Sequence, residues 1–448
     1  MAKKKRPEAK TPAVKRSLAP WIEPLVIACV LFVIFYPRLQ NTTFHGDESW
    51  GIATSHYLEA FVEGRTDSPV WNESYETLTQ PPLTRYVIGI GRRFGGYGPG
   101  DLNRPWNFRL SNEDNIARGT MPNSDLLWWS RLPMCILTVV CALIAFNFAS
   151  RSAGRLAGYV MLTLLVFNPY LSNTLFRAMG EAPLLAATML AALAGSQAVI
   201  SGKQAVAQRH QVRKRFLHSL IWFGIMGVCC GIAGAAKLNG LSIILAGLAL
   251  SSLILFVQTS NVSRSEILKT IAFAWVSLIL AAAFTFVALN PYLYPNPIGR
   301  TEKMVAQRLS EMERQQASYS AAKISGPLIP RVVLIGERVF YQCAALRFAG
   351  SWIINVLLCL VGLWFLLFAA WAWLRSGAGY GGSLVLLVIA FTASTPALMT
   401  PLDWDRYYLF PVFFSTIFIA VGVSRIIQGL WEWTRPWRVS REKTVKAN

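Results

Sequence analysis

Two adjacent carboxylates, Asp47 and Glu48, follow a glycine in the segment from Phe44 to Trp50. Carboxylates in such a position can supply a general base and a second acid or hydrogen-bond acceptor. The same pattern is typical of a helix N-terminus, where Asp and Glu accept hydrogen bonds from amides that have no partner within the helix. The local sequence alone favours the second interpretation, so a catalytic role needs support from other parts of the chain.

Two further segments carry a proline pair and a pair of opposite charges. Pro81 and Pro82 fix an extended backbone just before an apolar stretch. Arg177 and Glu181 are four positions apart, close to the edge of a predicted membrane span. An unpaired carboxylate is costly at that depth, so we expect the two side chains to form an ion pair, as neighbours on one helical face do.

Cationic side chains occur in two other unusual places. Lys237 lies in a tight Lys-Leu-Asn-Gly turn between two apolar stretches. The segment 401–411 contains Asp403, Asp405, Arg406 and Tyr407. Aromatic residues there are typical of a membrane interface, but an interface does not account for the charged residues.

Long apolar stretches connect these residues and must position them. The 448-residue chain is 54% hydrophobic and only 15% charged, whereas soluble domains carry about 25% charged residues. About 20 apolar residues are enough to cross the hydrocarbon core of a bilayer. Ten such stretches predict spans at 21–37, 131–149, 156–175, 182–200, 217–236, 240–258, 270–290, 350–374, 383–400 and 406–428. The sequence therefore predicts an all-α polytopic membrane protein with about ten to twelve transmembrane helices.

The net charge of +20 is distributed as the positive-inside rule predicts. Basic residues gather at 1–20, 203–215 and 435–446, whereas a nucleic-acid-binding protein concentrates them on a folded polar domain. We therefore expect cytoplasmic termini and no nucleic-acid partner. The expected organisation is a membrane domain at 21–430 between basic tails at 1–20 and 431–448.

With this orientation, two long loops, 38–130 and 291–349, lie on the outer side of the membrane. The first holds eleven of the 23 acidic residues, and no Asp or Glu lies at the middle of a predicted span. Ion-coupled transporters need an ionisable group at mid-membrane depth, so this distribution favours chemistry at the outer surface. In the second loop, the polar segment 301–320 predicts a lid or, preferably, an interfacial helix, and the apolar segment 328–347 suggests a half-span.

Taken in order, these motifs resemble those of the GT-C superfamily of glycosyltransferases, which use polyprenyl-phosphate sugars. The most similar branches are the protein O-mannosyltransferases and the bacterial lipid A aminoarabinose transferases. The resemblance covers residues 20–430 and rests on Asp47-Glu48, Pro81-Pro82-Leu83, Arg177 with Glu181, Lys237-Leu-Asn-Gly240, and Arg406-Tyr407-Tyr408 with Pro411. Two positions depart from the pattern: Leu238 replaces an aromatic residue of the mannosyltransferases, and Gln80 replaces a charged residue of the aminoarabinose transferases.

The resemblance implies an inverting transfer of a hexose or pentose from a polyprenyl-phosphate donor to a hydroxyl acceptor, at the extracytoplasmic face. Asp47 would be the general base, taking the acceptor proton as the new bond forms. Glu181 and Glu48 would position the acceptor or the sugar. The lipid tail of the donor would lie in an apolar groove between the spans.

The resemblance also implies which residues bind the donor phosphate. Arg406, assisted by Lys237 and Arg177, would neutralise the leaving phosphate, for which a planar guanidinium is well suited. No cofactor is implied, and a divalent metal is neither required nor excluded. The residues expected to position donor and acceptor are Pro81, Pro82, Asp403, Asp405 and Tyr407.

Two other classes of protein remain as alternatives. A lipid or saccharide transporter or flippase would line a path through its spans with polar residues, and few are present, Asn147 and Gln197 among them. A non-catalytic membrane subunit would tolerate replacement of the first-loop carboxylates. The order of the motifs favours the transferase, and we expect a multi-pass protein of a bacterial plasma (inner) membrane.

Overall fold

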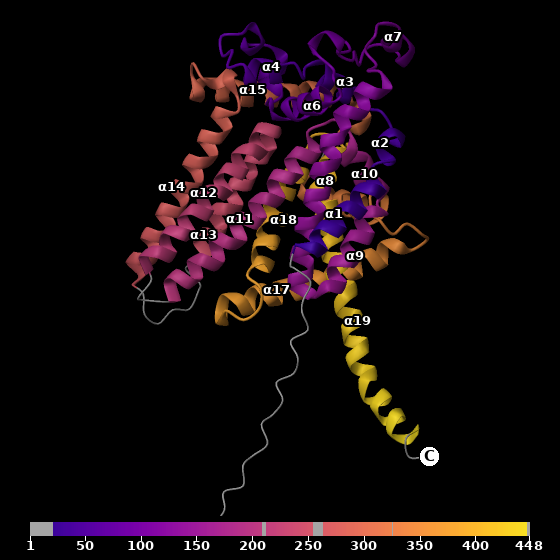
Figure 1. Cartoon of the computed structure of the whole chain (residues 1–448), viewed down its shortest axis with the longest axis vertical. Helices are drawn as coiled ribbons and strands as arrows, with labels where there is room; N and C mark the ends of the chain where they lie inside the picture. Colours follow the sequence, from indigo (N-terminus) through magenta and orange to yellow (C-terminus); the bar gives the residue numbers. More distant parts are fainter. Residues whose placement is uncertain (1–20, 208–211, 254–262, 325, 446–448) are drawn as a thin grey trace, which may run out of the picture.

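The computed structural model describes residues 21–207, 212–253, 263–324 and 326–445 (Figure 1). These residues fold almost entirely into helices, and no β-strand occurs among them apart from one isolated bridge between Lys323 and Leu402. The predicted basic tail at 1–20 and part of the basic loop at 203–215 lie outside the described residues. The expectation of an all-α protein is confirmed.

Within the described residues, seven helices are long and apolar enough to cross a membrane. They are α8 (Ser124–Ala153), α11 (Glu181–Ala207), α12 (Val212–Ala236), α14 (Arg264–Ala288), α17 (Ser351–Ser376), α18 (Gly382–Met399) and α19 (Leu409–Val445). Three shorter apolar helices occupy three other predicted spans: α1 (Ile22–Phe35), α9 (Arg155–Val166) and α13 (Ile243–Leu253). Each of the ten predicted spans thus contains an apolar helix, and the chain is a multi-pass membrane protein.

The span predicted at 156–175 is wrong in one respect, because two helices divide it. After α9, a new helix α10 (Pro169–Phe176) begins at Asn168, whose side chain accepts a hydrogen bond from the Leu171 N–H at 3.1 Å. Proline is favoured in the first turn of a helix, where its missing N–H is not needed. The chain then extends at Arg177 and turns before α11 begins at Glu181.

Helix α11 lies at the centre of the bundle. In the most apolar 18-residue stretch of α11, 78% is buried inside the protein, compared with 28% in the corresponding stretches of α14 and α17. Its many alanines allow neighbouring helices to approach closely, and α12 packs along much of its length. The central position matters for the site, because the first residue of α11 is Glu181.

Two glycines permit the close contact between α17 and α19. A Cβ on Gly362 would meet the Phe418 carbonyl oxygen at 1.8 Å, and one on Gly422 would meet the Leu358 carbonyl oxygen at 2.1 Å. The two backbones therefore pack directly against each other. This contact fixes the direction of α19 and so the position of Arg406 just before it. Helix α19 continues through the predicted tail at 431–448 as far as Val445.

Short helices from both predicted outer loops gather at one end of the bundle, opposite the end at which α19 reaches the C-terminus (Figure 1). The second loop contributes α15 (Pro297–Ser318), whose Lys303 pairs with Glu73 of the first loop at 2.6 Å. The first loop ends earlier than predicted, because α8 begins at Ser124. Its helices are α2 (Arg38–Asn41), α3 (Gly46–Ala53), α4 (Tyr57–Val62), α5 (Tyr75–Thr79), α6 (Leu83–Phe94) and α7 (Asn112–Ala117).

The apolar segment predicted at 328–347 forms a short helix, α16 (Leu328–Glu337), followed by a π-helical turn at Arg338–Gln342. Arg331 of α16 donates hydrogen bonds to the carbonyl oxygens of Leu398 (3.1 Å) and Thr400 (2.8 Å) at the end of α18. Since the last carbonyls of a helix lack partners within it, Arg331 caps α18 and holds α16 against the bundle.

Candidate active site

Asp47 and Glu48 lie in the first turn of α3, after the N-cap residue His45. The His45 ring accepts a hydrogen bond from the Asp47 N–H at 3.1 Å, and Glu48 Oε1 accepts one from the His45 N–H at 3.1 Å. These two hydrogen bonds form a capping box. The helix-cap interpretation is therefore correct for Glu48, whereas the cap leaves the Asp47 carboxylate free for another partner.

Glu48 is fully buried and forms a two-fold ion pair with Arg131 of α8, with both N–O distances at 2.7 Å. Glu48 Oε2 also accepts a hydrogen bond from the Ala178 N–H at 2.9 Å. Arg131 in turn donates to the carbonyl oxygens of Leu39 (2.7 Å) and Thr42 (3.0 Å). The pair therefore ties α3 to α8, to the end of α2 and to the turn before α11, and so fixes the neighbouring residue Asp47.

Asp47 forms an ion pair with Arg406, which is 359 positions further along the chain. Arg406 lies in the 3₁₀ turn before α19, with its guanidinium carbon 4.7 Å from the Trp404 ring and 5.6 Å from the Tyr407 ring. Burial alone would raise the pKa of the Asp47 carboxyl, but Arg406 and, more weakly, His45 hold that pKa below its usual value. Asp47 is therefore ionised at neutral pH.

Glu181 is buried and pairs with Lys237, whose Nζ lies 2.8 Å from Glu181 Oε1. The predicted pairing of Glu181 with Arg177 is wrong: Arg177 Nε donates to the Thr43 carbonyl oxygen at 3.1 Å. The reason is that α10 ends at Phe176 and α11 begins at Glu181, so the two residues do not share a helical face. Lys237, predicted from its isolated place in a turn, takes the position expected of Arg177.

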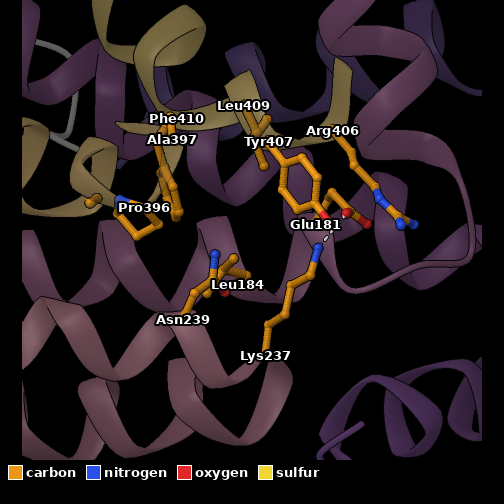
Figure 2. Close-up of a pocket in the computed structure, with 11 residues that line it drawn as sticks. Glu181, Leu184, Lys237, Asn239, Pro396, Ala397, Arg406, Tyr407, Leu409 and Phe410 are labelled. Atoms are coloured by element: carbon orange, nitrogen blue, oxygen red, sulfur yellow. Dashed lines mark hydrogen bonds and ion pairs between the residues drawn. The ribbon is translucent and has the colours of Figure 1, made fainter. Parts of the chain in front are cut away.

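A pocket links these pairs to the apolar interior (Figure 2). Lys237 rises from one side towards Glu181, while Tyr407 and Arg406 project from the start of α19. Glu181, Lys237, Arg406 and Tyr407 lie together on one side of the pocket (Figure 2). The remaining lining residues are Leu184, Asn239, Ala393, Pro396, Ala397, Leu409 and Phe410. One end of the pocket is thus charged and the other mostly apolar.

Two atoms at the charged end are buried without a hydrogen-bond partner among the described residues: Glu181 Oε2 and Arg406 Nε. Leaving a buried acceptor or donor unpaired costs about 1–3 kcal/mol. An acceptor and a donor left in this way, on residues that line one pocket, are typical of a site that a polar ligand completes.

The prolines lie beside the pocket and do not line it. Pro81 and Pro82 are buried, and Pro82 precedes the first residue of α6. At the second residue of that helix, Thr84 Oγ1 donates to the Ala236 carbonyl oxygen at 3.2 Å, next to Lys237. The proline pair therefore places the start of α6 against the turn that carries Lys237.

Asp403 and Asp405, expected to position donor and acceptor, instead face a cation of the second loop. Asp403 forms an ion pair with Arg338 of the π-helical turn and accepts a hydrogen bond from Tyr408 Oη at 2.8 Å. Asp405 lies 3.8 Å from the same guanidinium. Both carboxylates therefore link the second loop to the start of α19, and neither lines the pocket.

No group of three His, Cys, Asp or Glu side chains within the described parts of the chain is arranged to hold a metal ion. His45 lies 3.7 Å from Asp47 but is engaged in the helix cap. The charged side chains of the pocket are paired with one another across elements, carboxylate to cation.

The sequence analysis missed Arg131. Its signal was present: a single arginine at the start of an otherwise apolar span, where an unpaired charge is costly and a buried partner is expected. The partner was not predictable, because Glu48 is 83 positions away.

A bundle of apolar helices with a charged pocket near the folded outer loops defines a polytopic membrane protein. Residues 50–301 match the family model of the dolichyl-phosphate-mannose-protein mannosyltransferases. The match covers more than half of the chain, which therefore belongs to this family. It includes Glu181 and Lys237, whereas Asp47 and Arg406 lie outside the matched segment.

Two solved structures resemble the fold. ArnT from Cupriavidus metallidurans, bound to undecaprenyl phosphate, is 14% identical over 91% of this chain and 60% of its own, with a TM-score of 0.52. The archaeal oligosaccharyltransferase AglB from Archaeoglobus fulgidus, in complex with an inhibitory peptide and a dolichol-phosphate, is 13% identical over 94% of this chain and 52% of its own, with a TM-score of 0.45. The chain thus spans 60% or less of the length of these proteins. No curated protein matches the sequence. The ArnT similarity confirms the expected GT-C-type fold.

Proposed function

We propose that the chain is a glycosyltransferase that moves a sugar from a polyprenyl-phosphate carrier to a hydroxyl acceptor, with inversion at the anomeric carbon. The observation that carries the proposal is the pocket, whose charged end holds Arg406, Lys237 and Glu181 and whose other end is mostly apolar. A lipid phosphate is divided in the same way as the pocket, because it has an anionic head group and an apolar chain. The family membership and the undecaprenyl phosphate bound to ArnT support the same donor class.

In the proposed reaction, the bond between the anomeric carbon and the phosphate oxygen breaks as the acceptor oxygen bonds to that carbon. The electron pair of the broken bond leaves with the polyprenyl phosphate. Asp47 takes the proton of the acceptor hydroxyl late in this step, because an ordinary carboxylate cannot deprotonate an alcohol beforehand. Arg406 and Lys237 neutralise the charge that develops on the leaving phosphate.

Arg406 has a second role in this scheme, because it pairs with Asp47 in the structure. A donor phosphate that binds Arg406 competes with Asp47 for the guanidinium. Binding of the donor therefore weakens the Asp47–Arg406 contact and frees the carboxylate to accept a proton. Glu181, with one oxygen on Lys237 and the other unpartnered within the described structure, is placed to bind a sugar or acceptor hydroxyl.

The other predicted site residues have supporting roles in this proposal. Glu48 positions Asp47 through Arg131, and Tyr407 forms part of the pocket wall. Pro81, Pro82, Asp403, Asp405 and Arg177 hold the elements that surround the pocket. We further propose that the pocket opens on the extracytoplasmic face of a plasma (inner) membrane, since the basic segments of the sequence favour that orientation.

The test is turnover of the donor by purified protein in nanodiscs. Polyprenyl-phosphate hexoses and pentoses are offered one at a time, and release of polyprenyl phosphate is followed with and without simple hydroxyl acceptors. We expect release from one sugar class. If the protein binds polyprenyl-phosphate sugars and carries them across the bilayer without cleaving any, the transferase proposal is wrong and the protein is a flippase.

Replacing Lys237 should lower donor turnover strongly. We expect Lys237→Met to reduce the rate of polyprenyl phosphate release about 100-fold, because a cation at the leaving group is lost and the buried Glu181 keeps an unpaired charge. Lys237→Arg should retain much of the rate. The control is Arg155→Met, which removes an exposed partner of Glu23 at the opposite end of the bundle and should leave turnover unchanged. Equal rates for Lys237→Met and Arg155→Met would exclude this role for Lys237.

A further inference from the structure

Helix α15 connects the first loop to the segment just before α19. Near its beginning, Lys303 pairs with Glu73 at 2.6 Å. In its middle, the Tyr75 hydroxyl donates to Glu311 at 3.5 Å. Just beyond its end, the Tyr319 ring contacts the Trp404 ring edge-on, with centroids 5.4 Å apart. The expected polar helix at 301–320 is therefore a strap that joins the first loop to the segment before α19.

This strap carries one cation to the edge of the pocket. Arg308 is half-buried, and its Nη2 donates a hydrogen bond to the hydroxyl of Tyr407 at 3.5 Å. Tyr407 lines the pocket and also contacts Arg406 through its ring. Burial and the nearby Glu311 raise the pKa of the Tyr75 hydroxyl, and Asp47 raises it further. The positive charge of Arg308 acts in the opposite direction and lowers that pKa. Tyr407 therefore connects Arg308 to Arg406, the cation that pairs with Asp47.

Arg308 differs from the other cations of the pocket, because it forms no ion pair within the described part of the chain. Arg406 is neutralised by Asp47, and Lys237 by Glu181. Arg177, a further cation near α3, contacts the Thr43 backbone and no pocket residue. A half-buried guanidinium held only by a long hydrogen bond to a phenol is well placed to exchange that contact for an anionic ligand.

We propose that Arg308 binds the phosphate of the lipid donor and stabilises the polyprenyl phosphate as it leaves. The inference rests on the proposed function and adds a third cation to that site. Among the paired charges of the site and Arg308, three cations (Arg308, Arg406 and Lys237) stand against two carboxylates (Asp47 and Glu181), which leaves one positive charge and matches a phosphodiester. When Asp47 takes the acceptor proton, its negative charge is lost and the net charge of the site rises from +1 to about +2. This charge matches the phosphate monoester that leaves, which is nearly doubly negative.

The test compares Arg308→Gln and Arg308→Lys with the wild-type protein and with Arg314→Gln. Arg314 lies on the same helix, is exposed and pairs with Glu311, so it controls for a change of charge on α15. Binding of undecaprenyl phosphate and of neutral undecaprenol is measured in nanodiscs, together with kcat and KM for the sugar donor. Thermal unfolding identifies any variant that is not folded.

We expect Arg308→Gln to weaken binding of undecaprenyl phosphate about 10-fold or more, without changing binding of undecaprenol. Its kcat should fall by more than its donor KM rises, because the leaving phosphate carries more charge than the donor. Arg308→Lys should recover part of the loss, and Arg314→Gln should behave as wild type.

Wild-type affinity for undecaprenyl phosphate in folded Arg308→Gln would overturn the inference. So would a change confined to the KM of the acceptor, which would assign Arg308 to an anionic group of the acceptor. A wild-type protein that binds undecaprenyl phosphate but cleaves no donor would contradict the proposed function while the binding comparison still decides the role of Arg308. A wild-type protein that does not bind undecaprenyl phosphate would contradict both.

Discussion

Asp47→Asn should abolish measurable transfer while leaving the donor pocket able to bind lipid phosphate. We expect the rate of polyprenyl phosphate release to fall about 10²–10⁴-fold, the usual contribution of a general base. Asparagine has nearly the same shape but cannot accept the acceptor proton. Binding of polyprenyl phosphate should be equal or tighter than in the wild type, because Asp47 no longer competes for Arg406. The measurements are donor turnover and equilibrium binding in nanodiscs.

The combination of the two results separates a base from a residue that only shapes the site. The matched control is Asp67→Asn, an exposed carboxylate of the same loop, which should retain full activity. If Asp47→Asn lost turnover and phosphate binding together, the carboxylate would be holding Arg406 in place and not acting as a base. Full turnover in Asp47→Asn would assign the base to Glu181, whose carboxylate lines the pocket.

The second large effect is on stability and concerns the buried pair of Arg131 and Glu48. We expect Arg131→Gln to destabilise the protein by about 3–5 kcal/mol, since it leaves a fully buried carboxylate without its cation. The Leu39 and Thr42 carbonyls lose their donor as well. Thermal unfolding in detergent should show a large decrease in Tm, and donor turnover should fall because α3 no longer holds Asp47 in place.

An exposed pair of the same type provides the control. Arg65 and Glu63 also lie 2.7 Å apart, but more than half of each side chain is exposed. Arg65→Gln should change stability by less than about 1 kcal/mol. The double variant Arg131→Met with Glu48→Gln should recover part of the lost stability, because it removes the uncompensated charge. Equal Tm decreases for Arg131→Gln and Arg65→Gln would show that burial does not govern this pair.

Much of the fold follows from local sequence, because a membrane span is specified by its own composition. About 20 apolar residues can cross a bilayer only as a helix whose backbone hydrogen bonds are all internal, so ten spans were predictable without knowledge of their packing. The errors fall at proline and at helix ends. Pro169 divides one predicted span, and α8 begins at Ser124, several residues before its apolar stretch.

The identity of the candidate site residues was also available from the sequence. Glu181, Lys237 and Arg406 are charges at the ends of apolar stretches, where the cost of burial makes an unexplained charge conspicuous. Asp47 was indicated by the resemblance of its Asp-Glu motif to that of a known family. The ion-pair partners of these residues could not be predicted from the sequence. The i,i+4 spacing suggested that Glu181 pairs with Arg177, but Lys237 occupies that position.

The partners depend on the tertiary structure because they come from elements far apart in the chain. Asp47 meets Arg406 across 359 positions, and Glu48 meets Arg131 across 83. These ion pairs depend on how α3 packs on α6 and α6 on α8, and on how Gly362 and Gly422 bring α17 against α19. The sequence by itself determined which helices form and which charges lie at their ends. Only the packing of the helices decided which of those charges meet, since side-chain periodicity carries no information beyond a few turns of one helix.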